Sequence, residues 1–480
     1  MALRGERHAA LIALAAVLLA APLGLLAATE ARTWALAAIG GAVVAGATAT
    51  GFRRDPVLVV VALWAFQIVR TPLAVAVPQV DQLSDVVLLV VLIALAVDLL
   101  SPSAPPRDLR LFAPAIGLLF FGLASSAAQS APLAPTLTGA WLGTKFWLLV
   151  GASVAIPWRA GDLDRALAIM APIGTIAALL GLLDFATGGA VADALRSNLR
   201  VTPLGTYRSG AAQSLYAHPN EYSLAMSLLV ALFLARLATR ARARASDVAL
   251  VVLFVAAAVV SLRLKAVLSV TAAFAVVAVV QIARGRRGGV GLLAGGAVVV
   301  VAVFLAMGSV IGQQLNTYGS SQTSVRAQLY DVGARIADDH APFGVGFGRY
   351  ASAPSRDHYS PVYDLYGLSR VWGLSRDFPR FVADTSWPSV MGETGYGGLA
   401  VFAAGLLALA LAAVVALRRA RGSDALAPLA LSCALVVLLV DSTGNPNLFS
   451  WNAITVIALL SGATLAQLPA RARAREPALA

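Results

Sequence analysis

The chain has 480 residues, of which 59% are hydrophobic and only 12% are charged, and its apolar runs are too long and too numerous for the core of a water-soluble protein. The 36 Lys and Arg residues exceed the 24 Asp and Glu residues and give a net charge of +12, but no basic and aromatic RNA-reading pattern accompanies them. We therefore attribute the charge to membrane topology and attraction to anionic lipids, and we expect no nucleic-acid partner. The single cysteine, Cys433, excludes disulfides and cysteine metal sites.

Apolar runs recur along the whole chain. Runs such as Val57–Val69, Val248–Val260 and Leu399–Leu417 fit helices that cross roughly 30 Å of hydrocarbon with about 20 residues each. The ten-residue alternation of a membrane β-barrel does not occur. The pattern predicts an all-α, polytopic membrane helix bundle with 12 to 14 spans. We count 14, which start near residues 9, 33, 57, 84, 109, 141, 164, 221, 247, 266, 290, 389, 425 and 450.

The order of these spans divides the chain into four parts. We expect N-terminal spans over residues 1–184, central spans over 185–308, a large loop over 309–388, and C-terminal spans with a basic tail over 389–480. The segment Arg4–Ala28 has the composition of a signal peptide. Because so many spans follow it, we expect a retained first helix.

The basic residues predict the orientation. Arginines group on alternate connections, for example at Arg53 and Arg54, and they are sparse in the short connections between. By the positive-inside rule, both termini are then cytoplasmic and the 309–388 loop faces outward. The excess of Arg over Lys, together with the many alanines, suggests a GC-rich bacterial genome, so the expected location is the bacterial inner membrane.

The segment Ser309–Pro388 is a polar island in this apolar chain. It holds six of the 10 tyrosines, two of the 4 histidines and seven of the 36 basic residues. Its His and Asp residues lack metal-ligand spacing, and we expect neither a metal nor another cofactor. Apolar residues within it recur at helical spacing, which predicts an amphipathic helix lying on the membrane or across the bundle. These residues are Val325, Leu329, Val332 and Ile336.

Two stretches of the island leave alternatives open. Phe343–Gly348 has three glycines at alternate positions, as in a phosphate-binding loop, but no strand and helix of a nucleotide fold flank it. Close packing of a turn is therefore the alternative interpretation. Tyr350–Trp387 is rich in aromatic residues and arginines, which bind sugar rings and phosphates. An aromatic belt at the membrane interface explains the same composition.

Three other outward-facing segments are polar. Asp193–Glu221 ends in the string His-Pro-Asn-Glu at the start of a span, and Asp441–Asn447 is a tight turn between the last two spans. The turn Ser261–Lys265 is so short that it holds two cations at the rim of the membrane.

Only two of the basic residues are lysines, Lys145 and Lys265, and both lie near the outer ends of spans. A cation there pairs with lipid phosphate or with a nearby carboxylate such as Asp184, or it binds a substrate.

Four segments carry a resemblance when they are taken together. They are, in chain order, RSGAAQSLYAHPN at 208–220, SLRLKAVL at 261–268, RIADDHAPFGVGFGRY at 335–350 and DTSWPSVMGETGYGGL at 384–399. Their order, spacing and location resemble those of the O-antigen ligase/polymerase superfamily. The resemblance covers roughly residues 200–465, whereas the N-terminal spans are similar only in hydropathy.

Members of that family are GT-C type glycosyltransferases. They move a glycan from an undecaprenyl-pyrophosphate donor to an acceptor hydroxyl at the outer face, without a metal or a nucleotide sugar. The resemblance implies a lipid-linked oligosaccharide donor, a glycan or lipid acceptor, and contact with membrane lipids. It implies that pyrophosphate is bound by Arg208, Arg263, Lys265 and Arg326.

The resemblance also implies a catalytic role for Asp384, which stands where the ligases have a histidine. A partly desolvated carboxylate can accept a proton from the acceptor. This difference favours a polymerase-like or exopolysaccharide enzyme over a ligase. Contacts to the glycan or acceptor are expected from His218, His358, Tyr350 and Trp387.

Two other classes of protein remain open. A flippase of lipid-linked oligosaccharides would also have many spans, but transporters place polar sites at mid-membrane between related repeats, and this chain has its polar residues at the rim and no internal repeat. A structural or regulatory membrane protein that has lost its chemistry would explain the aspartate at position 384.

Overall fold

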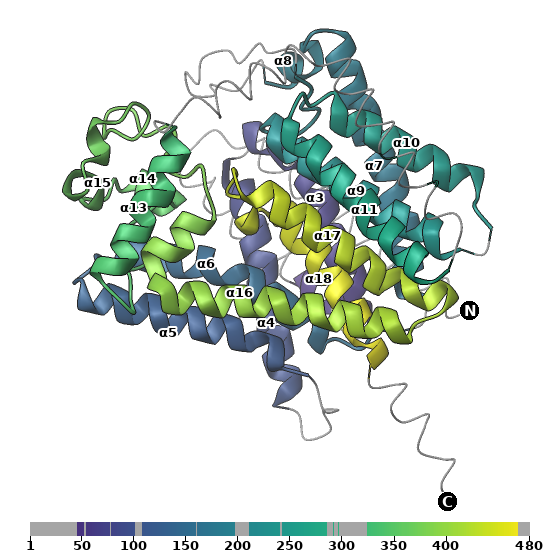
Figure 1. Cartoon of the computed structure of the whole chain (residues 1–480), viewed down its shortest axis with the longest axis horizontal. Coiled ribbons are helices and arrows are strands. Elements are labelled where there is room, and N and C mark those ends of the chain that lie inside the picture. Colours follow the sequence, from purple (N-terminus) through teal and green to yellow (C-terminus); the bar gives the residue numbers. More distant parts are fainter. Residues whose placement is uncertain are drawn as a thin grey trace, which may run out of the picture.

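The computed structural model describes residues 46–51, 54–76, 78–100, 108–159, 161–196, 211–240, 242–285, 291, 296 and 324–468. This part of the chain is helical and contains no strand (Figure 1). The bundle consists of α3 (Pro56–Ala76), α4 (Leu83–Leu99), α5 (Ala113–Ala128), α6 (Leu133–Ala155), α7 (Asp162–Ala186), α9 (Pro219–Thr239), α10 (Ala245–Val259), α11 (Leu264–Ala283), α16 (Trp387–Arg419), α17 (Leu426–Ser442) and α18 (Trp451–Leu465).

Eight of the described helices are long and apolar enough to cross a membrane, namely α3, α4, α5, α7, α9, α11, α16 and α17. The helices begin within a few residues of the predicted starts, except that α6 begins at Leu133 and not near residue 141, directly after Pro132. The predicted spans from near residues 9, 33 and 290 lie wholly or mostly outside the described residues. The number 14 therefore remains a prediction.

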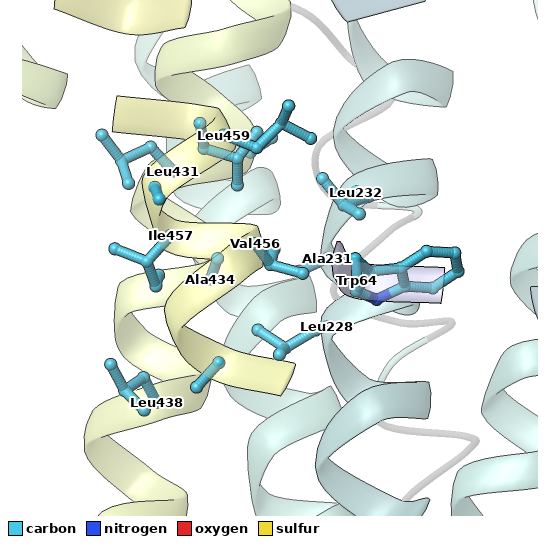
Figure 2. Close-up of a cluster of buried hydrophobic side chains, with 14 of the residues drawn as sticks. Trp64, Leu228, Ala231, Leu232, Leu431, Ala434, Leu438, Val456, Ile457 and Leu459 are labelled. Atoms are coloured by element: carbon cyan, nitrogen blue, oxygen red, sulfur yellow. The ribbon is translucent and has the colours of Figure 1, made fainter. Parts of the chain in front are cut away.

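The centre of the bundle is α9, which is buried on nearly all sides and packs against α10, α11 and α17. Figure 2 shows side chains of α9, α17 and α18 packed into one cluster with Trp64 of α3. Because lipid tails are as apolar as leucine, helices in a membrane associate through close packing. Gly405 of α16 illustrates this, since a Cβ there would lie 2.5 Å from the ring of Trp147 on α6.

The described part of the predicted loop forms a small unit at one end of the bundle, beside the start of α16 (Figure 1). It contains α13 (Val325–Asp339), α14 (Ala353–Asp357) and α15 (Val362–Leu365). The predicted amphipathic helix is confirmed as α13, and Ser324 caps it by accepting a hydrogen bond from Ala327 N at 3.1 Å. Its apolar face packs into a second core, which we call the loop core and which includes Leu329, Val332, Ile336, Tyr350 and Tyr363.

The glycine-rich turn Phe343–Gly348 packs directly against other backbone. Gly348 has φ +71°, and a Cβ there would lie 2.1 Å from the carbonyl oxygen of Pro135. Immediately after the turn, Tyr350 N and the Ser352 hydroxyl donate to buried Glu393 Oε1 at 3.2 Å and 2.5 Å. The carboxylate beside this turn is thus that of Glu393, from the same chain. Close packing against backbone explains the glycines of the turn.

The charged residues divide the bundle into two ends. At one, which we call the arginine end, Arg165 pairs with Asp55 and Arg240 pairs with Asp247. Arg284 there donates to the carbonyls of Leu417 and Ala420, at 2.6 Å and 3.2 Å. These residues come from connections that the sequence predicted to share one side of the membrane. The loop unit lies at the opposite end, which we call the rim end.

Candidate functional site

Five charged side chains from four separate segments meet at the rim end, and we call them the rim cluster: Arg263, Lys265, Arg326, Asp384 and Asp441. Lys265 Nζ donates to the carbonyl oxygen of Gly444 at 3.1 Å. A Cβ placed on Gly444 would lie 3.8 Å from both Lys265 Nζ and Arg326 Nη1. Two cations that are distant in sequence therefore converge on one turn.

The turn between α10 and α11 holds Arg263 and Lys265 in place. It is closed by a hydrogen bond from Leu262 N to Val259 O at 2.9 Å, and Leu262 adopts the left-handed region with φ 53°. A branched apolar residue adopts this conformation only when the surrounding structure enforces it. Arg263 is the residue before α11, and its charge acts on both Lys265 and Asp384.

The turn between α17 and α18 provides the surface on which the cations converge. Its fold depends on Asp441, which is 1% exposed and accepts hydrogen bonds from the side-chain amides of Asn445 and Asn447. Ser386 ties the end of the loop to this turn by donating to Asn445 O at 2.8 Å. The carbonyl of Gly444 is thereby fixed from several directions.

Asp384 is the partly exposed carboxylate of the rim cluster. Arg326 Nε and Nη2 both contact its Oδ2, at 2.7 Å and 2.6 Å, and the side chains of Arg326 and Asp384 are 24% and 23% exposed. Within the described residues, no hydrogen bond engages Oδ1. Burial raises the pKa of Asp384, and the opposing effect of Arg326 does not cancel this rise. The carboxylate is thus a better proton acceptor than an ordinary aspartate.

Two predicted residues, His218 and His358, lie at or beyond the edge of this cluster, and a third cannot be compared with it. Arg208 lies outside the described residues. His218 is exposed before α9, and its Nδ1 accepts a hydrogen bond from Asn220 N at 3.0 Å. His358 is exposed at the end of α14, and no hydrogen bond or ion pair in the described part of the chain links it to the rim cluster.

The two predicted aromatic contacts have different surroundings. Tyr350 does not fit its expected role, because its side chain is 0% exposed in the loop core and its hydroxyl donates to Leu329 O at 2.7 Å. Trp387 is partly exposed at the start of α16. Its Nε1 donates to Ser442 Oγ at 3.0 Å, which places the indole beside the turn that carries Gly444.

A second group of charges at the rim end was not predicted. Arg70 of α3 lies between Asp81 and Glu221, with ion-pair distances of 3.7 Å and 3.8 Å. A signal was present in the sequence, because Arg70 is a charge within an apolar run, and such charges mark functional sites in membrane proteins.

Lys145 has a partner other than the one the sequence suggested. It pairs with Asp85 at 3.9 Å and lies 4.8 Å from the centre of the Trp451 ring. Asp184 instead accepts hydrogen bonds from the backbone of Ala192 and Gln213 at 2.9 Å and 3.0 Å. A nearby carboxylate is thus the partner of Lys145, as one of the two interpretations expected.

No family model and no curated protein matches this chain. Within the described ranges, no three His, Cys, Asp or Glu side chains are placed to hold a metal ion. Partly exposed Arg and Lys side chains that converge on one point form charge-assisted hydrogen bonds with phosphate oxygens, and a half-buried carboxylate beside them can accept a proton.

Proposed function

We propose that the protein is a membrane glycosyltransferase that moves a glycan from a polyprenyl pyrophosphate to an acceptor hydroxyl in surface polysaccharide synthesis. The observation that carries this proposal is the convergence of Lys265 and Arg326 on Gly444, with Arg263 and Asp384 beside them. We further propose that the membrane is the bacterial inner membrane, that both termini are cytoplasmic and that the rim end faces outward.

The position of the cluster suits a lipid-linked pyrophosphate. Lys265 and Arg263 lie at the end of an apolar helix, and Arg326 comes from the loop unit above it. A polyprenyl chain would remain in the hydrocarbon while its pyrophosphate lies at the level of these cations. Arg208 would add a further cation from the segment before α9.

The reaction is a displacement at the anomeric carbon of the donor sugar. The acceptor oxygen forms a bond to that carbon, while the bond from the carbon to the pyrophosphate oxygen breaks. The leaving pyrophosphate keeps the electron pair, and Arg263, Lys265 and Arg326 stabilise its charge. Asp384 Oδ1 takes the acceptor proton and later releases it to water. Arg326 fixes Oδ2 and so orients the carboxylate.

A reconstituted transfer assay tests the proposal. Full-length protein in nanodiscs is mixed with lipid-linked oligosaccharide from the source cells, and longer glycans and released polyprenyl pyrophosphate are measured. We expect both products to form at equal rates. Movement of the lipid-linked sugar across vesicles without either product would overturn the proposal in favour of a flippase. In a deletion strain, single repeat units on the surface would indicate a polymerase, and unanchored polymer a ligase.

A further inference from the structure

The second charged group at the rim end surrounds the start of α9, and we call it the α9 group: Arg70, Asp81, His218 and Glu221. The side chains of Arg70, Asp81 and Glu221 are 25%, 59% and 29% exposed, so they are accessible from the same end as the rim cluster. Arg70 Nη2 is 3.8 Å from Glu221 Oε1, which is an ion pair without a hydrogen bond. The carboxylate is therefore oriented by the charge of Arg70 and by a hydrogen bond from the backbone of Ala217, and its remaining lone pairs can accept further hydrogen bonds.

A hydrogen-bonded bridge places this group next to the rim cluster. Asn220 Nδ2 donates to Asn445 Oδ1 at 2.8 Å, and the neighbouring carbonyl of Gly444 accepts from Lys265 at 3.1 Å. Glu221 directly follows Asn220, and consecutive Cα atoms are about 3.8 Å apart. The two groups are thus adjacent parts of one polar surface.

The two groups differ in the ligands that they favour. The α9 group has two carboxylates and one arginine, so it repels an anionic pyrophosphate, whereas the rim cluster, with three cations and two carboxylates, attracts it. Carboxylate oxygens instead accept hydrogen bonds from sugar hydroxyls. A charged carboxylate forms stronger hydrogen bonds than a neutral acceptor does.

His218 supplies the complementary donor. Its Nδ1 accepts the hydrogen bond from Asn220 N at 3.0 Å, so the neutral ring carries its proton on Nε2. The ring is exposed, and Nε2–H is a donor at the same helix end as Glu221. A donor and an acceptor side by side match the hydroxyl groups of a sugar, which both donate and accept.

We propose that the α9 group is the acceptor subsite, in which Glu221 and His218 bind hydroxyls of the acceptor glycan and Arg70 positions Glu221. This inference rests on the proposed glycosyl transfer and adds to it. The donor pyrophosphate binds at the rim cluster, the acceptor sugar binds at the α9 group, and the Asn220–Asn445 bridge separates them. Charge thus sorts the two substrates.

Two binding measurements on full-length protein in nanodiscs test this assignment. The probe for the donor end is undecaprenyl pyrophosphate, and the probe for the acceptor end is the free oligosaccharide released from the lipid-linked donor by mild acid. We expect Glu221→Gln to weaken oligosaccharide binding roughly tenfold or more, through loss of hydrogen bonds to a charged group, and to leave undecaprenyl pyrophosphate binding within about twofold. Lys265→Ala should instead weaken undecaprenyl pyrophosphate binding and leave oligosaccharide binding unchanged.

The controls separate the possible failures. Asp364→Asn, which removes an exposed carboxylate of α15, should change neither affinity, and retained pyrophosphate binding by Glu221→Gln shows that this variant is folded. Unchanged oligosaccharide binding by Glu221→Gln, or an equal loss of both probes, would overturn the acceptor subsite alone. Wild-type protein that binds neither probe would overturn the proposed function together with it.

Discussion

Both ends of the helix bundle concentrate charged residues, but they use them in different ways. At the arginine end, Arg240 pairs with Asp247, and Arg284 donates to the carbonyls of Leu417 and Ala420, so these cations bind partners on neighbouring elements. At the rim end, Lys265 and Arg326 come from elements that are far apart in the chain and converge on one carbonyl turn. The contacts at the arginine end join helices, whereas those at the rim end bring together the residues that we propose as a site.

The comparison teaches that the number of charges does not identify a site in a membrane protein. Arginines that satisfy helix ends or mark topology are expected on every such chain. A site requires that cations be partly exposed, be held from several directions, and lie beside a group with an altered proton affinity. Asp384 fulfils the last condition, because burial raises its pKa.

The largest effect that would break this comparison is expected from Asp384→Asn. Since a general base contributes roughly 10²–10⁴-fold to a rate, kcat for glycosyl transfer should fall by at least about a hundredfold while donor binding persists. The base must be ionised, so wild-type transfer should rise as pH rises through the pKa of Asp384. An ordinary aspartate has a pKa of about 3.9. Because the pKa of Asp384 is raised, the acid limb of the pH–rate profile should lie at a higher pH than that value. Transfer against pH measures both effects.

One outcome would contradict the role of Asp384 as a general base. If Asp384→Asn transfers glycan at the wild-type rate with the same acid limb, Asp384 only orients Arg326. Asp331→Asn is the matched control, because this exposed carboxylate on α13 pairs with Arg335 at 3.2 Å and lies outside the rim cluster. It should change neither kcat nor the pH profile.

A smaller effect is expected on donor binding from the two converging cations. Lys265→Ala and Arg326→Ala should each weaken undecaprenyl pyrophosphate binding roughly tenfold to a hundredfold, the effect of about 1.5–3 kcal/mol for a charge-assisted hydrogen bond. Equilibrium binding in nanodiscs at fixed salt measures this. Arg335→Ala, on the same helix as Arg326, is the control and should bind normally. Equal losses in all three variants would mean that diffuse positive charge attracts the lipid and that no built site exists.

The sequence predicted most of the helices and the parts of the rim cluster, for reasons that are local. Hydropathy placed α9, α11 and α17, because each crosses the bundle as one apolar run. The helical spacing of the apolar residues at 325, 329, 332 and 336 predicted α13, because one helix face packs into the loop core. Arg263 and Lys265 were identified by their place in a short turn between two spans, because such a turn holds both cations at the rim of the membrane.

The resemblance implied that Arg263, Lys265 and Arg326 share one ligand, but the individual contacts between segments could not be predicted, because they depend on packing across the bundle. Nothing local indicates that Arg326 and Lys265 share Gly444, or that Lys145 pairs with Asp85 and not with Asp184. Tyr350 lies in a stretch whose composition is typical of a sugar-binding surface, yet its neighbours Leu329 and Tyr363 bury it in the loop core. Composition identifies candidates for a site, and only the fold decides which of them reach its surface.

The smallest effect is expected at the arginine end, and it sharpens the comparison from that side. Arg165 pairs with Asp55, but its side chain is 52% exposed, and exposed ion pairs contribute roughly 0–1 kcal/mol. Arg165→Ala should therefore lower the melting temperature of the purified protein only slightly and leave both pyrophosphate affinity and kcat at wild-type values. Raising the salt concentration should remove the small difference in melting temperature, because exposed charges are screened. A tenfold loss of donor affinity in Arg165→Ala would instead show that the two ends are coupled, and the division into joining charges and site-forming charges would fail.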